Sequence, residues 1–261
     1  MHNTPRPSVG MSTLLILSVL CALIPGCSGG PNPADLRLQT AAELLKRNKT
    51  HQARAQIEAA IQLDPSRSST YWSAMRLYLR EDLFSDAART GELLLKRAES
   101  SKLDRGLLVE EKARLYIVLG SSYQSDDDLA NAERTYKAAL ALAPDSPELL
   151  NALGYFYAEE GIKLDEALKL TARAVNLAPD AGHIVDSLGW AQYKLGRYKA
   201  AANTLKRAIE LRPDDDTLRY HLGAAYAKQG RQLEAFIELK KALVLNAHMT
   251  DSVKLLKTLQ K

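Results

Sequence analysis

Cysteine is nearly absent from this 261-residue chain. The only two, Cys21 and Cys27, lie within the first 27 residues. The rest of the chain can therefore contain neither a disulfide nor a cysteine-based metal site. Packing of side chains has to supply its stability.

An excess of one charge is also lacking. The 35 Lys and Arg residues and the 31 Asp and Glu residues are interspersed, and the formal net charge is only +4. Such a pattern is typical of a solvated surface and not of a basic nucleic-acid footprint. We therefore expect no nucleic-acid partner.

Catalytic and ligand-binding motifs are missing as well. The histidines do not follow the HExxH spacing, and the chain has no GxSxG elbow and no GxxxxGKS/T loop. The acidic runs 126–128 and 214–216 lack the alternating ligands, the Gly and the terminal Glu of an EF-hand. Each run precedes an expected helix, where acids cap free amides and suit the helix dipole. We expect no enzyme activity, no cofactor and no metal ion.

A period of about 34 residues dominates what is present. Its clearest unit is 184–213, two short amphipathic helices joined at Gly196 and closed by Pro213. One extra residue falls within 162–164, where it lengthens a turn. Small residues recur at this period in three ladders, which are Gly120, Gly154, Gly189 and Gly223; Ala132, Ala167, Ala201 and Ala235; and Ala139, Ala174, Ala208 and Ala242.

This unit resembles the tetratricopeptide repeat. Its characteristic places are filled by Leu188, Gly189, Ala201, Ala208 and Pro213. Small residues allow helix axes to approach more closely than the usual ~8–10 Å, and proline stops the second helix. The resemblance implies an all-α fold, a right-handed α-solenoid of about six helix-turn-helix repeats with a C-terminal capping helix.

The frame divides the chain into segments. Residues 102–112 form an insertion, interpreted as a helix extension or, alternatively, as a partner-specific bulge. The final segment is expected to be an amphipathic helix that covers the open end of the stack, with a membrane-surface or partner helix as the alternative. The segments are 34–101, two degenerate repeats; 102–112, the insertion; 113–249, four regular repeats; and 250–261, the capping helix.

The N-terminus has the shape of a signal peptide over 1–26, with an apolar run too short for a membrane span. Residues 23–27 resemble a bacterial lipobox, which implies lipidation of Cys27. Ser28 at the next position points, by resemblance, to the outer membrane facing the periplasm. Conventional cleavage and an uncleaved anchor are the alternatives. Residues 27–33, rich in turn formers, are expected to be a flexible tether.

By resemblance, the first helix of each repeat lines a concave groove that binds an extended peptide or a helix of another protein. Rigid aromatic rings beside amide and charged groups suit such a ligand. Trp190 is the expected central contact, and the alternative is that Tyr155, Trp190 and Tyr193 pack between helices. The groove positions are Trp72, Arg76, Asn151, Tyr155, Asp186, Trp190, Tyr193, Tyr220 and Lys228.

Two classes of function follow. The first is a non-catalytic scaffold held by lipid in the bacterial cell envelope. The second is an enzyme or accessory subunit of an envelope assembly or export machine, with a site in 102–112, although that insertion has no His, Cys, Ser or Thr. No repeat pairs the Lys and Asn of the family's carboxylate clamp, which disfavours a chaperone-tail adaptor.

Overall fold

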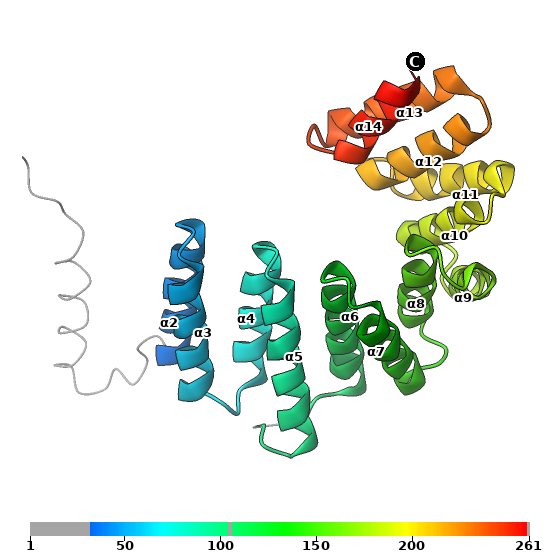
Figure 1. The fold of residues 1–261 in the computed structure, drawn as a ribbon. Coiled ribbons are helices and arrows are strands. Elements are labelled where there is room, and N and C mark those ends of the chain that lie inside the picture. Colours follow the sequence, from blue (N-terminus) through cyan, green and yellow to red (C-terminus); the bar gives the residue numbers. More distant parts are fainter. Residues whose placement is uncertain (1–31, 104–105, 260–261) are drawn as a thin grey trace, which may run out of the picture. The chain divides into compact units, whose positions relative to one another are not determined.

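The computed structural model describes residues 32–103 and 106–259, and within these ranges it contains helices and no strand (Figure 1). The expected all-α fold class is confirmed. The helices are α2 (Pro33–Lys46), α3 (Thr50–Leu63), α4 (Ser68–Arg80), α5 (Phe84–Glu99), α6 (Val109–Ser125), α7 (Leu129–Leu142), α8 (Pro147–Glu159), α9 (Leu164–Leu177), α10 (Gly182–Lys194), α11 (Tyr198–Leu211), α12 (Asp216–Lys228), α13 (Gln232–Leu245) and α14 (Thr250–Leu259).

The helices follow one another as six helix-turn-helix segments and a final single helix, as expected from the period. The chain divides into two compact units, of which the first ends at Leu77 and the second begins at Tyr78, inside α4. In the second unit α6 packs on α7, α8 on α9, α10 on α11 and α12 on α13, while α8 and α12 each also contact α10. A stack of helical hairpins results.

The first unit is built on small residues where α2 and α3 cross. Ala34, Ala41, Ala53 and Ala60 are fully buried there, so the two backbones can approach closely. The bulky Met75 of α4 is buried as well. The repeat that contains Met75 is irregular in sequence, yet the side chain of Met75 is packed in the core.

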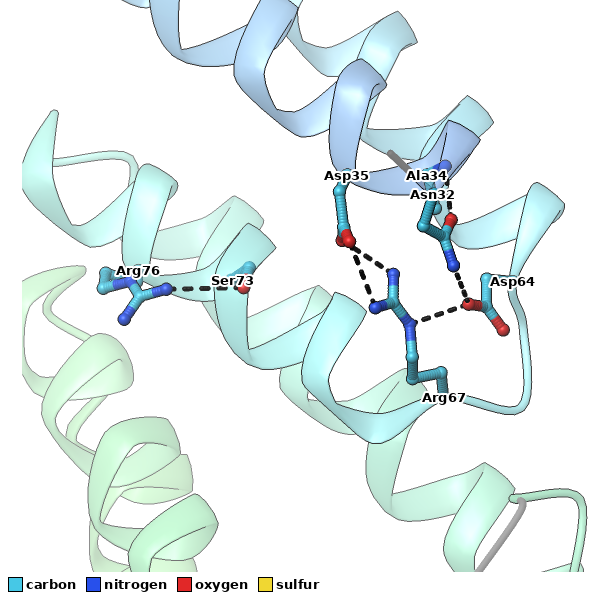
Figure 2. Close-up of polar contacts among 7 residues, drawn as sticks. All are labelled: Asn32, Ala34, Asp35, Asp64, Arg67, Ser73 and Arg76. Atoms are coloured by element: carbon cyan, nitrogen blue, oxygen red, sulfur yellow. Dashed lines mark hydrogen bonds and ion pairs between the residues drawn. The ribbon is translucent and has the colours of Figure 1, made fainter. Parts of the chain in front are cut away.

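Arg67 ties the start of α2 to the turn between α3 and α4 (Figure 2). Its guanidinium donates to both carboxylate oxygens of Asp35, at 2.7 and 3.3 Å, and its Nε lies 2.7 Å from Asp64. Asn32 donates to the same Asp64 and accepts from the Ala34 amide, which caps α2. The bidentate hydrogen bond with Arg67 lowers the pKa of Asp35.

Helix crossings in the second unit rest on the glycine ladder. A Cβ atom added to Gly120 would lie 2.7 Å from the Tyr136 ring, and one on Gly154 would lie 2.8 Å from the methyl group of Thr171. Added Cβ atoms on Gly189 and Gly223 would likewise meet leucine side chains of the second helix at 2.7 and 2.8 Å. Carbon atoms do not approach so closely, so the space for a side chain is already filled.

The alanine ladders lie in the same crossings. All eight alanines of the two ladders are at most 1% exposed, which fits their role as close-approach residues; they are Ala132, Ala139, Ala167, Ala174, Ala201, Ala208, Ala235 and Ala242. Leu150, Ile184 and Leu205 fill the space between neighbouring hairpins and are fully buried. The three ladders therefore hold the repeat packing together.

The extra residue at 162–164 is accommodated in the turn between α8 and α9. Lys163 takes a left-handed conformation there, with φ +46°, and pairs with Glu133 of α7. Glu133 also accepts from the Tyr157 hydroxyl at 3.0 Å and pairs with Lys137 at 2.6 Å. Hydrogen bonds from the two lysines lower the pKa of Glu133 to about 2. The turn that holds the extra residue thus adds a polar contact between neighbouring hairpins.

Two expected boundaries are corrected. The 102–112 insertion is not simply a helix extension, because only Val109–Lys112 join α6, while α5 already ends at Glu99. The tether was expected to run to Pro33, but Asn32 caps α2 and Pro33 begins it. A helix starts readily at proline, which needs no backbone donor there. The signal segment, Cys27 and residues 28–31 lie outside the described residues.

The helix caps and the final helix agree with the sequence. Asp128 accepts from the Asn131 amide, and Asp215 accepts from the amides of Thr217 and Leu218, so both acidic runs cap helices. Helix α14 packs on α13 and α12 through the buried Leu256. The expected capping helix is therefore present over 250–259. No helix within 32–103 and 106–259 combines the length and apolar character needed to cross a bilayer.

Candidate partner-binding surface

The candidate surface lies on the first helices of three successive repeats, α8, α10 and α12. Their predicted residues cluster within the second unit, where Tyr155, Tyr193 and Tyr220 pack against a core that contains Trp190. Trp72 and Arg76 belong to the first unit and are not part of this cluster. Trp72 is half-buried, and the exposed Arg76 contacts Ser73 at 3.4 Å (Figure 2).

Trp190 lies beneath the surface and not on it. Only 5% of the residue is exposed. Its ring stacks on Tyr193, with centroids 4.6 Å apart, and on His221 at 4.0 Å. Its Nε1 donates to the carboxylate of Glu159 at 2.6 Å. The expectation that Trp190 is the central partner contact is thus corrected. Tyr193 of the same helix and His221 of the next repeat stack on the indole, and Glu159 of the preceding repeat accepts from its Nε1.

Asp186 is buried for a related reason. Its carboxylate is paired with His221 Nδ1, at 2.8 and 3.0 Å from its two oxygens, and the two residues are 5% and 3% exposed. Burial of a carboxylate is unfavourable unless it is paired and hydrogen-bonded, and the imidazole supplies that partner. The expectation that Asp186 is a polar contact in the groove is therefore also corrected. A substrate could not reach His221, so the pair is interpreted as structural.

The three tyrosines are half-buried and form the accessible part of the cluster. Burial raises the pKa of Tyr220 to about 12, with the Asp251 charge adding to the effect. Burial also raises the pKa of Tyr193, and burial with the charges of Glu159 and Asp186 raises that of Tyr155. Their hydroxyls stay protonated near neutral pH and can donate hydrogen bonds to a ligand.

Polar groups border the tyrosines. Lys194 Nζ donates to the Glu159 carbonyl at 2.8 Å and lies 5.1 Å from the Trp190 ring centroid. Lys228, at the end of α12, is exposed. Asn151 on α8 is half-buried, and its Oδ1 has no hydrogen-bond partner among the described residues. The surface therefore offers aromatic area with donors and acceptors at its edges.

Sequence reasoning did not assign roles to Glu159 and His221. Each contacts a groove position one repeat away: Glu159 of α8 contacts Trp190 of α10, and His221 of α12 contacts Asp186 of α10. The pairing of His221 with Asp186 could have been predicted from their spacing, because they are 35 residues apart, close to one repeat length. Within residues 32–103 and 106–259, no three His, Cys, Asp or Glu side chains gather as a metal site would require.

Comparisons with known proteins agree with this architecture. Residues 117–182 match a family model described as a tetratricopeptide repeat, and residues 189–230 match one described as a TPR repeat. A TPR repeat-containing protein of Pseudomonas aeruginosa is 33% identical over 150 residues, which are 57% of this chain and 25% of that protein. The chain thus spans about a quarter of the length of this relative.

Solved structures show a likeness of fold. The Cut9 and Hcn1 hetero-tetramer of the APC/C contains a chain with a TM-score of 0.63 and 19% identity, covering 95% of this chain and 45% of that one. Yeast Tom70 has a TM-score of 0.61 and 16% identity, covering 87% of this chain and 47% of its own. Both similarities extend over most of this chain.

Proposed function

Because this chain is built of tetratricopeptide repeats, we propose that it is a non-catalytic scaffold that binds an extended segment of another protein on α8, α10 and α12. Repeats of this kind are generally interaction modules, and a stack of hairpins offers a long continuous face to a ligand.

The observation that carries the proposal is the row Tyr155, Tyr193 and Tyr220 on three successive first helices. Each of these tyrosines is partly exposed. The stacked Trp190 and the Asp186–His221 pair lie beside them and hold this part of the core in place. A rigid tyrosine buries much area with little loss of side-chain entropy, so this row suits a peptide ligand.

Photo-crosslinking tests the proposal. With p-benzoylphenylalanine in place of Tyr220, we expect a discrete covalent adduct with another protein when cells that produce the full chain are irradiated. The matched control places the same group at Lys169, an exposed residue of α9. Adducts of equal yield from both positions, or none from Tyr220, would show that the tyrosine row is not the binding face.

We also propose that the scaffold is lipid-anchored through Cys27 in the bacterial cell envelope, at the outer membrane facing the periplasm. The support is the lipobox-like segment 23–27 and the Ser that follows it. One acyl chain binds a membrane marginally, whereas two or more give stable attachment.

Cys27→Ser is expected to leave an unprocessed precursor or to release soluble protein, because the thiol that carries the lipid is gone. Membrane fractionation and labelling with an alkyne fatty acid measure this. A variant that fractionates and matures like wild type contradicts the anchor, while the crosslink from Tyr220 tests the scaffold separately.

A further inference from the structure

A basic hollow lies beside the tyrosine row, where the turn between α10 and α11 meets the end of α12. Arg197, Lys199, Lys228 and Arg231 contribute to its lining, and of the described residues that line it none is acidic. The first three are exposed. This contrasts with the rest of the chain, in which charges of both signs are interspersed.

Three of the four cations have no ion-pair partner within 32–103 and 106–259. Arg231 is engaged, because it pairs with Glu234 and lies 4.2 Å from the Tyr226 ring centroid. Within the described residues, no carboxylate forms an ion pair with Arg197, Lys199 or Lys228. Like charges held close together repel one another, so an anion in the hollow would relieve that repulsion.

The hollow continues the aromatic row. Tyr198 lines it, and the Tyr198 ring lies 5.4 Å from that of Tyr193, which in turn stacks on Trp190. Gln229 fixes this edge by donating to the Tyr198 carbonyl at 2.9 Å. A ligand that covers the tyrosines of α10 and α12 therefore reaches the cations without leaving the surface.

We propose that the hollow binds a cluster of carboxylates in the partner segment, so that the scaffold recognises apolar or aromatic residues next to a run of Asp or Glu. The proposal rests on the proposed function and names the chemistry of its ligand. The cations lie at the start of α11, in the turns before α11 and α13, and at the end of α12. They are away from the helix positions of the family's carboxylate clamp, whose Lys and Asn pair the chain lacks.

A protein ligand fits this site better than a polyanion. Nucleic acid and anionic membranes present charge over long distances, and binding to them uses an extended basic stripe. Here the cations of the hollow lie together between two neighbouring repeats, next to aromatic side chains. A short acidic segment matches both its size and its surroundings.

The probe for the test is a fluorescein-labelled peptide in which Phe-Gly-Phe precedes a run of glutamates, measured by anisotropy with the full chain. We expect binding that weakens as salt rises from about 0.05 M to about 0.5 M, because exposed charges are screened. The same peptide with glutamine in place of glutamate is expected to bind at least about tenfold more weakly.

Charge reversal locates the site. Lys199→Glu with Lys228→Glu is expected to weaken the acidic peptide at least about tenfold, because two attractive charges become repulsive. Lys169→Glu with Lys240→Glu changes the net charge equally at exposed residues of α9 and α13 and is expected to leave affinity within about twofold. Circular dichroism checks that both variants fold.

Several results would overturn the proposal. These are equal binding of the glutamate and glutamine peptides, equal losses in the two double variants, or tighter binding of duplex DNA or phosphatidylglycerol vesicles than of the peptide. The outcome for the scaffold is separate. If Lys199→Glu with Lys228→Glu keeps the full crosslink from Tyr220, the acidic specificity fails while the scaffold stands.

Discussion

Replacing Trp190 with alanine is expected to lower the free energy of unfolding of the second unit by about 3–5 kcal/mol, as for other large aromatic residues in cores. The indole is 5% exposed and stacks between Tyr193 and His221. Its loss opens a cavity and also removes the donor to Glu159. Denaturant unfolding followed by circular dichroism measures the change.

Trp190→Phe is the matched control. Phenylalanine keeps a ring in the stack but cannot donate to Glu159, so a smaller loss of about 1.5–3 kcal/mol is expected from the hydrogen bond to a charged group. The result that would contradict the structure is a Trp190→Ala chain with unchanged stability but lost partner binding. That result would mean that Trp190 is exposed and contacts the partner directly.

Repeat packing could be predicted from the sequence because it depends on residues that recur. Gly154, Gly189 and Gly223 stand at a nearly constant spacing, and each meets the second helix of its own hairpin. A pattern that repeats within a local unit constrains local contacts. The same holds for the acidic helix caps, whose partners lie two or three residues away.

The orientation of Trp190 could not be predicted in this way. Its position on α10 is compatible with a groove and with a neighbouring helix, and helical periodicity does not separate the two. What decides is the chemistry of single residues in other repeats, Glu159 on α8 and His221 on α12. Neither belongs to the repeat's characteristic pattern, so the sequence provided no rule for either.

The insertion 102–112 exposes another limit. Its helical part, Val109–Lys112, begins where Glu111 accepts from the Leu108 amide at 3.0 Å. The repeat period shows where extra residues are inserted, but it does not show which of them form a loop and which join a helix. That division depends on a local hydrogen bond at the helix start.

Gly189→Leu is expected to cost the second unit at least about 1–3 kcal/mol, the usual range for overpacking. Even a single added carbon would lie 2.7 Å from Leu205 Cγ and 2.8 Å from Leu205 Cδ2, and leucine adds three more. The α10–α11 crossing must then widen, which also disturbs the contacts of α10 with α8 and α12. A thermal melt followed by circular dichroism is the measurement.

The source of the loss is identified by a partner substitution. Leu205→Ala alone should destabilise by about 2–5 kcal/mol, as a buried leucine does when it is truncated. Combined with Gly189→Leu it also removes the clash, so the double variant is expected to lose less than the sum of the single losses.

Gly196→Ala is the control, because Gly196 has φ +75° and nothing within 4 Å of an added Cβ. Its loss should be conformational and should not respond to Leu205→Ala. A Gly189→Leu melt that matches wild type, or additive losses with Leu205→Ala, would show that close approach at Gly189 does not hold the repeat together.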